Sequence, residues 1–249
     1  MIKDIINMYK RYRNEANVLI YQMGKVGSSS LEHSIPGAIN VHTLFANSPC
    51  PPHFKNQSRG LKGWLRHSLP FVFKRIALRR RNVLKIITLV REPVSRNRSM
   101  FFQDLYHWLA DYVVSAKASA KTEGLELLQA CYEEHFNHDY FDNWFNNEIK
   151  KLTGVDVFKY PYHPGSPCII REKRCEILVI RLEDLAANID KVEEFLGHNL
   201  SHVDTNVGER KWYAPVYKSF VTETPLFEVE RLLSQSVTSR HFGYSRDDQ

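Results

Sequence analysis

Two glycines, a lysine and three serines stand close together, directly after a short apolar run. A glycine turn that leads from a strand into a helix gathers several backbone N–H groups around one point, and serine hydroxyls can donate as well. Lysine adds a full positive charge. The pattern predicts a cradle for an anion, best suited to phosphate, formed by Gly24, Lys25, Val26, Gly27, Ser28, Ser29 and Ser30.

This segment differs from the phosphate-binding loop of ATP-using enzymes. That loop needs a lysine directly after its last glycine, whereas Lys25 precedes Gly27 by two positions. A second interpretation is a capped helix after a glycine turn, with Ser28 as the N-cap. The segment alone leaves both interpretations open.

A second polar segment follows the apolar run Leu84–Val90. Arg91 stands at the end of that run, and Ser99 follows about two turns into the next expected helix. If this helix packs back against the strand end, the guanidinium and the hydroxyl can hold one phosphate from two sides, because the planar fork of arginine bonds two oxygens. We expect Arg96 and Arg98 to be solvated.

His42 ends a third apolar run and is the candidate general base. Transfer of a group to a hydroxyl requires a proton acceptor, and imidazole has a pKa near neutrality. Glu32, one turn into the expected helix that follows the cradle, is the alternative base. A purely structural role for a lone histidine also stays open.

The elements that must position these segments are strands alternating with helices. This alternation predicts βαβ units and a mainly parallel sheet. Ligands bind at the carboxyl ends of the strands in such sheets, which is where the three polar segments fall. We expect one α/β domain over residues 1–249 with a mostly helical insertion at about 103–152. Strands are expected at residues 18–21, 39–42, 84–90, 155–158 and 177–181.

Composition limits the classes of protein. With 43% hydrophobic and 25% charged residues among 249, the chain is expected to fold into a packed domain. The net charge of +6 favours anionic ligands without choosing among them. The longest apolar runs fall far short of the roughly 20 residues that cross a bilayer. The N-terminus also lacks the apolar stretch of a secretory signal, so a membrane span is not expected.

Two further features leave alternatives open. The four cysteines form no C-x-x-C pair, which favours reduced thiols, although Cys168 and Cys175 could meet across a hairpin in an oxidising compartment. The basic stretch from Lys74 to Lys85 is expected to be a solvated helix face. Its functional alternative is attraction of an acidic glycan or of a highly charged donor. Glu183 and Asp184 are expected to stabilise the first turn of a helix.

The two phosphate-type segments together resemble a known family. Lys-x-Gly-Ser-Ser after one strand and Arg-x-Pro-x-x-Arg-x-x-Ser after a later one are similar to the sulfotransferases that use 3′-phosphoadenosine 5′-phosphosulfate (PAPS). The similarity covers Tyr21–Leu31 and Leu89–Phe102, in the family's order and with its spacing from Arg91 to Ser99. The resemblance implies a three-layer P-loop-like fold with PAPS as donor and no required metal.

The resemblance also implies roles for individual residues. The 5′-phosphosulfate would be held by Lys25, Gly27, Ser28 and Ser29, and the 3′-phosphate by Arg91 and Ser99. A late basic loop often closes over the nucleotide in sulfotransferases. This implies phosphate contacts for Arg210 or Lys211 and stacking for Trp212. The alternative is that Trp212 and Tyr213 pack a C-terminal helix onto the sheet.

A narrower resemblance concerns the acceptor. The block Lys211-Trp212-Tyr213 is similar to an Asn-Lys-Trp-Tyr-Ser block of a bacterial family of capsular polysaccharide synthesis proteins, although this chain has Arg210 and Ala214 at the flanks. The resemblance implies a carbohydrate acceptor, polysaccharide biosynthesis and a cytoplasmic enzyme of bacterial type. The Golgi lumen is the alternative if a longer precursor carries an anchor.

These inferences combine into one predicted activity, the in-line transfer of a sulfuryl group from PAPS to a hydroxyl. Lys25 would neutralise the leaving phosphate, and His42 would accept the proton of the acceptor. Nucleic acid is not expected as a partner. Two alternatives stay open: an ATP-dependent P-loop-like kinase, or a non-catalytic protein that binds acidic glycans or other polyanions. The kinase would need the Gly-Lys-Ser/Thr triplet that is missing here.

Overall fold

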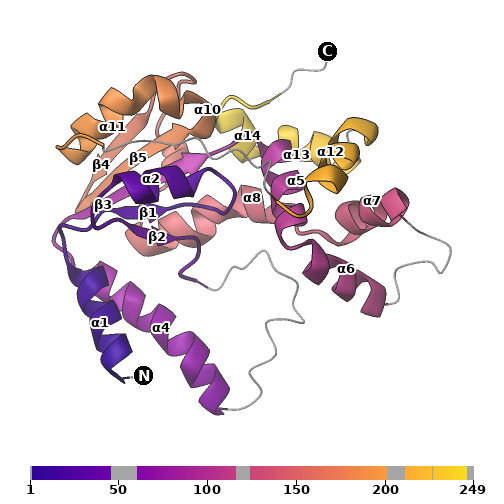
Figure 1. Ribbon diagram of the computed structural model, residues 1–249. Coiled ribbons are helices and arrows are strands. Elements are labelled where there is room, and N and C mark those ends of the chain that lie inside the picture. The colour runs from indigo at the N-terminus through magenta and orange to yellow at the C-terminus, as the bar shows by residue number, and fades with distance from the viewer. Residues whose placement is uncertain (1, 46–60, 116–123, 201–210, 226, 246–249) are drawn as a thin grey trace.

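The chain forms an α/β structure around a central five-stranded sheet, as the computed structural model in Figure 1 shows. Its described residues are 2–45, 61–115, 124–200, 211–225 and 227–245. The strand order is β2-β1-β3-β5-β4, in which only β4 is antiparallel to its neighbour. The strands are β1 (Leu19–Tyr21), β2 (Ile39–Val41), β3 (Leu84–Val90), β4 (Cys168–Glu172) and β5 (Cys175–Arg181).

Helices cover both faces of this sheet, with α2, α10 and α11 on one side and α8 on the other (Figure 1). The α-helices are α1 (Ile2–Arg13), α2 (Ser28–Ser34), α4 (Leu61–Arg79), α5 (Pro93–Gln103), α6 (Leu105–Val114), α7 (Gly124–His135), α8 (Asp139–Trp144), α9 (Lys151–Thr153), α10 (Leu182–Leu185), α11 (Ile189–Leu196), α12 (Ala214–Glu223), α13 (Glu228–Ser234) and α14 (Val237–His241). A π-helix, η1 (Phe145–Lys150), and two 3₁₀ turns, η2 (Val157–Lys159) and η3 (Ala186–Asn188), complete the described helical elements.

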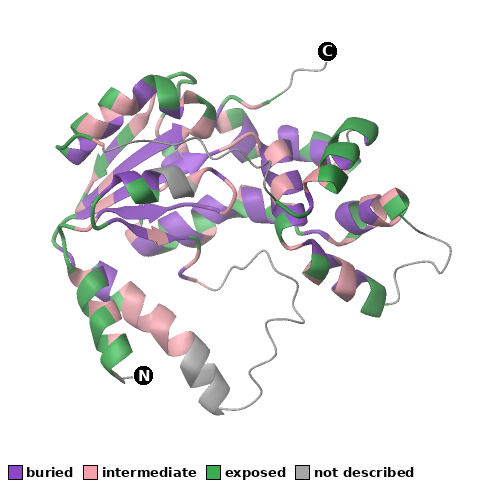
Figure 2. Cartoon of the chain, in the orientation of Figure 1, coloured by how far each residue is buried: buried purple, intermediate pink, exposed green. Residues whose placement is uncertain are grey.

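The apolar side chains gather in two cores. The larger core surrounds the sheet, whose central strands are buried on both faces (Figure 2). This double burial explains why these strands are continuous apolar runs instead of alternating ones. The second core is aromatic and joins α5, α6, α7 and α12, with Phe101, Phe102, Tyr132, Phe136 and Phe220 at its centre.

The sheet order has a reversal between β1 and β3. The chain leaves β1 toward β2 on one side, and leaves β3 toward β5 on the other. The carboxyl ends of these two strands therefore border the crevice where open α/β sheets bind ligands. The predicted cradle follows β1 and the Arg91 segment follows β3, so both predicted segments lie at this position.

One expected strand was wrong and one strand was missed. Residues 155–158 do not form a strand: Gly154 turns in the left-handed region at φ +78°, and the Asp156 side chain accepts a hydrogen bond from the Phe158 amide, which starts a 3₁₀ turn. The sheet edge is instead formed by β4. That strand alternates between exposed and buried residues and therefore lacks a continuous apolar run.

Two expected helix boundaries also differ. A single helix over about 94–109 is divided at Asp104 into α5 and α6. Part of the stretch expected to be irregular forms α12, which has a proline in its first turn, where no N–H partner is lost.

The hairpin of β4 and β5 keeps Cys168 and Cys175 apart. Cys175 lies opposite Glu172, and Cys168 lies opposite Val179, four positions further along β5. At about 3.3 Å per residue this separation exceeds disulfide reach. Both thiols are free, so the disulfide alternative was wrong.

In the part of the chain that the structure describes, no helix combines the length and apolarity required to cross a membrane.

Candidate anion-binding site

The loop between β1 and α2 is built on two left-handed residues. Lys25 has φ +72° and Gly27 has φ +84°. Gly27 is the N-cap of α2, so the interpretation of Ser28 as the N-cap was wrong. Ser28, Ser29 and Ser30 form the first turn of α2, and their side chains lie outside the described structure. With only seven residues α2 has few aligned peptide dipoles, so any anion binding here depends mainly on side-chain charge.

Gly27 is required by both conformation and space. An alanine Cβ at this position would lie 2.5 Å from Leu182 Cδ1, and its left-handed backbone costs an L-residue about 1–2 kcal/mol. We expect Gly27→Ala to lower the free energy of unfolding by about 2 kcal/mol or more, measured by urea denaturation. Gly24→Ala is the matched control, because its Cβ would meet Met100 Sδ at an ordinary 3.5 Å. Equal losses in the two variants would contradict the expectation.

Arg91 joins the two predicted segments directly. Its Nη1 donates a hydrogen bond to the Lys25 carbonyl at 3.2 Å, and its Nη2 donates to Ser95 Oγ at 2.6 Å. Ser99 lies four residues after Ser95, on the same face of α5, and is half-buried. The half-buried guanidinium thus reaches the cradle loop while its serine neighbours line one side of α5.

The expectation that Arg96 is solvated was wrong. Arg96 is fully buried, donates from Nε to the Gly24 carbonyl at 3.0 Å, and stacks 5.0 Å from the centroid of the Tyr140 ring. Burial lowers the pKa of Arg96 to about 10. Its Nη2 has no hydrogen-bond partner among the described residues. An uncompensated cation beneath the loop adds positive potential at the site.

Arg98 is also buried, which corrects the second half of that expectation. It pairs with Glu230 on α13, with Nε 2.7 Å from Oε1 and Nη2 2.8 Å from Oε2. This bidentate pair ties α5 to α13 and faces away from solvent. Two arginines of one helix therefore contact different neighbours: Arg96 contacts the cradle loop, and Arg98 contacts the aromatic core.

Lys211 brings a third charge to the loop from a distant part of the chain. Its amine lies close enough to the Lys25 amine for the two groups to influence each other's protonation. Burial, followed by the nearby charges of Lys211 and Arg91, lowers the pKa of Lys25 to about 7, although Asp104 opposes the shift. Burial alone would lower the pKa of Lys211, but its interactions with Lys25 and Tyr213 together outweigh burial and raise it. Near neutral pH, a larger fraction of Lys25 is thus unprotonated than in an isolated lysine.

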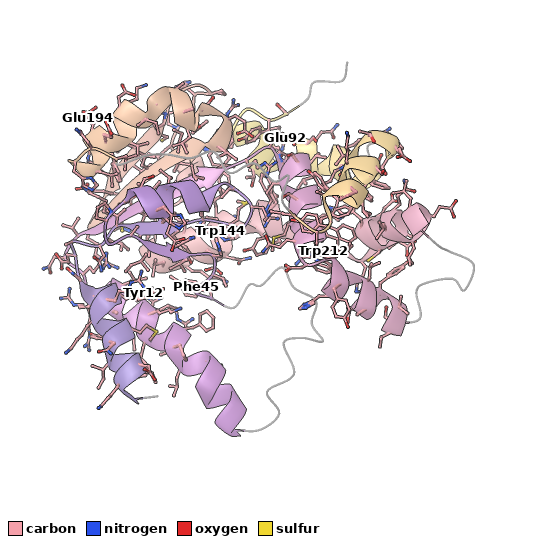
Figure 3. The ribbon with its side chains drawn as sticks, in the orientation of Figure 1. Tyr12, Phe45, Glu92, Trp144, Glu194 and Trp212 are labelled. Atoms are coloured by element: carbon pink, nitrogen blue, oxygen red, sulfur yellow. The ribbon has the colours of Figure 1, made fainter. Side chains whose placement is uncertain are left out.

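The aromatic core explains how Lys211 reaches Lys25. Tyr213 is buried against the Phe102 ring of α5, with centroids 5.9 Å apart, and the Lys211 amine lies over the Tyr213 ring. Trp212 is instead 74% exposed (Figure 3). The expected packing of an aromatic pair on the sheet was therefore wrong: one ring packs on α5 and the other faces solvent. Arg210 lies outside the described residues.

His42 is exposed at the end of β2, and a hydrogen bond to its ring fixes the side chain. Its Nδ1 is 3.1 Å from the Gln22 carbonyl oxygen. A carbonyl oxygen only accepts, so Nδ1 must donate, which leaves Nε2 of the neutral imidazole as a proton acceptor. Glu32, the alternative base, instead accepts a hydrogen bond from Asn40 at 2.9 Å, within the length of β2. His42 therefore offers a free ring nitrogen, and the carboxylate of Glu32 is engaged by Asn40.

Two other groups have structural roles. Glu183 and Asp184 lie in the first turn of α10 as expected, and Glu183 accepts a hydrogen bond from the Glu92 amide. The basic stretch is only partly solvated. Arg81 is buried and donates to the carbonyls of Tyr12 and Asn17, so the expectation of a solvated face was wrong there.

Sequence reasoning missed three members of this neighbourhood: Gln22, Ser95 and Arg96. Ser95 could have been found, because it stands four residues after Arg91, and positions four apart share a helix face. The burial of Arg96 could not be read from a helix whose sequence is polar on several sides. Gln22 binds by its backbone carbonyl, a contact that carries no sequence signal.

Among the described residues, no group of three or more histidine, cysteine or acidic side chains is placed to hold a metal ion. A comparison with protein-family models found no match, and neither curated proteins nor solved structures gave one.

Proposed function

We propose that this chain is a sulfotransferase with a P-loop-like fold that transfers a sulfuryl group from PAPS to a hydroxyl of a carbohydrate, such as a polysaccharide. The observation that carries the proposal is the convergence of Lys25, Arg91 and Lys211 at the reversal of the strand order. The charges of Lys211 and Arg91 help to lower the pKa of Lys25, so the protonated lysine is costly in an empty site, and a multiply charged anion removes that cost.

The arrangement suits a nucleotide with phosphates at two positions. Lys25 and Lys211 form one cationic group, and Arg91, with Ser95 and Ser99 along α5, forms a second. The first would take the 5′-phosphosulfate and the second the 3′-phosphate of PAPS. Arginine binds phosphate through paired N–H groups. This suits the 3′-phosphate, which stays unchanged in the reaction.

In the proposed reaction the acceptor oxygen attacks sulfur while the bond from sulfur to the bridging oxygen breaks. The leaving group is adenosine 3′,5′-bisphosphate, whose growing charge Lys25 neutralises. His42 Nε2 accepts the proton of the hydroxyl. A sulfuryl group carries less negative charge than a phosphoryl group. Lysine can therefore neutralise the charge of the leaving phosphate, a task for which kinases use magnesium.

A thermal-shift experiment tests the nucleotide preference. Adenosine 3′,5′-bisphosphate, 5′-ADP and ATP are compared without magnesium and with it. A ligand at 100 times its dissociation constant stabilises the native state by about 2.7 kcal/mol, which corresponds to a shift of about 5 °C or more for a chain of this size. We expect this shift for the 3′,5′-bisphosphate alone, and we expect Arg91→Ala to abolish it.

Arg171→Ala is the matched control, because Arg171 is an exposed arginine on the edge strand β4. This variant should keep the full shift. Stabilisation by ATP that requires magnesium would favour the kinase alternative. Equal stabilisation by heparin and by all three nucleotides, lost in high salt, would favour the polyanion-binding alternative.

A further inference from the structure

Residues 42–45, which follow β2 and begin with His42, are held by one buried carboxylate. Glu148 is fully buried in the π-helix η1. Its carboxylate accepts hydrogen bonds from Thr43 Oγ1 at 2.9 Å, from the Leu44 amide at 2.7 Å and from the Phe45 amide at 3.3 Å. Three successive residues of the segment therefore donate to one side chain.

A fourth donor comes from the sheet. The Tyr21 hydroxyl at the end of β1 also donates to Glu148. Burial, together with the Glu148 charge, raises the pKa of Tyr21, so this hydroxyl keeps its proton. Burying a carboxylate costs several kcal/mol, and here four hydrogen bonds offset that cost. An apolar side chain would fill the same space more cheaply but would hold none of these groups.

The segment is held at its other end by Trp144, one helical turn before Glu148. Trp144 Nε1 donates to the His42 carbonyl at 3.0 Å. The Trp144 ring, labelled in Figure 3, also packs edge-on against Tyr21 at the end of β1, with ring centroids 5.3 Å apart. The His42 ring is fixed separately by the Gln22 carbonyl. Backbone and ring of His42 thus have independent supports, and π-helices such as η1 occur frequently at functional sites.

We infer that Glu148 is a positioning residue for His42. It fixes residues 42–45 so that the imidazole keeps its Nδ1–H bond to Gln22 and offers an unprotonated Nε2 to the acceptor hydroxyl. The inference rests on the proposed function for the identity of the proton donor. The proton passes from the hydroxyl to Nε2 as the new O–S bond forms and the bond from sulfur to the leaving phosphate breaks.

Glu148→Gln tests the inference, because it keeps the shape and removes the charge that accepts four hydrogen bonds. We expect kcat to fall by about tenfold, part of the 10²–10⁴-fold that a general base contributes, while KM for PAPS and the thermal shift by the 3′,5′-bisphosphate stay unchanged. The double variant with His42→Ala should lose no more kcat than His42→Ala alone, because both changes remove the same contribution, that of the general base. Glu133→Gln, at an exposed position of α7, is the control.

Nuclear magnetic resonance reads the positioning without any turnover. In the wild type the His42 ring nitrogens should show the Nδ1–H tautomer, and the Leu44 amide should exchange slowly. Glu148→Gln should mix the tautomers and speed that exchange. Trp144→Phe removes the indole N–H together with part of a buried ring. It should weaken both signatures less than Glu148→Gln, and it serves as the test if Glu148→Gln does not fold.

The outcomes separate the two proposals. Variants that keep the wild-type tautomer, amide protection and kcat overturn the role of Glu148, whatever the nucleotide does. A wild-type protein that shows the tautomer but is not stabilised by the 3′,5′-bisphosphate overturns the proposed function and with it the identity of the proton donor, while the hold of Glu148 on His42 stands.

Discussion

Replacing Lys25 with methionine is expected to lower kcat for sulfuryl transfer by about 100-fold or more, comparable to the loss of one donor from an oxyanion hole. The reason is that Lys25 is the cation of the cradle loop, and methionine is an unbranched side chain, one atom shorter, that removes the charge. Release of the 3′,5′-bisphosphate from PAPS in the presence of an acceptor measures the effect.

The same substitution should change the pH dependence of binding. The pKa of Lys25 is lowered to about 7 by burial and by its cationic neighbours, so much of it is neutral above that pH. A phosphate ligand favours the ammonium form, and binding at pH 8 must therefore take up a proton. Affinity for the 3′,5′-bisphosphate should fall by up to about tenfold per pH unit above pH 7 and level off below it. Titration calorimetry in two buffers measures the proton.

Lys173→Met is the matched control for Lys25→Met. Lys173 is the other described lysine with a left-handed backbone, at φ +54°, and it lies exposed in the turn between β4 and β5. Its replacement removes a lysine from the same backbone conformation without touching the site. A Lys25→Met protein with the turnover and pH profile of Lys173→Met would remove the central role of Lys25.

Replacing Glu230 with alanine is expected to lower the free energy of unfolding by about 3–5 kcal/mol. Glu230 is fully buried and holds the Arg98 guanidinium through both oxygens, while the Tyr132 hydroxyl donates to Oε1 at 2.9 Å. Alanine would leave a buried arginine without its counter-charge. Chemical denaturation measures the loss.

Two controls distinguish the buried pair from surface charge. Glu228→Ala, in the same helix, removes an exposed partner of Arg231 at 3.5 Å and should cost less than about 1 kcal/mol. Arg98→Met combined with Glu230→Ala should recover part of the loss, because no charge remains buried. A double variant as unstable as Glu230→Ala would show that packing, and not the unpaired charge, sets the cost.

Much of the central architecture could be predicted from the sequence, because buried parallel strands are continuous apolar runs. β3 and β5 have this form, and their parallel pairing follows from the helices between them. The edge strand β4 could not be found in this way, since one of its faces meets solvent. Residues 155–158 show the opposite error, in which a short apolar run forms a 3₁₀ turn.

Site residues that directly follow a strand could be predicted from the sequence. Site residues whose burial depends on contacts with distant parts of the chain could not. Lys25 and Arg91 follow β1 and β3, so their meeting was expected from topology. The burial of Arg96 depends on a loop carbonyl 72 residues away, which no local pattern shows. Glu148 stands among aromatic residues, and its backbone partners lie about a hundred residues earlier in the chain.

The second core has a consequence for the order of assembly. The loop with Lys25 is translated long before α12, and at about 5–20 residues per second the interval is roughly 10–40 s. Until the aromatic helices dock and deliver Lys211, the crevice lacks one of its three cations. A nascent chain on the ribosome therefore carries an incomplete group of cations and completes it only after α12 docks.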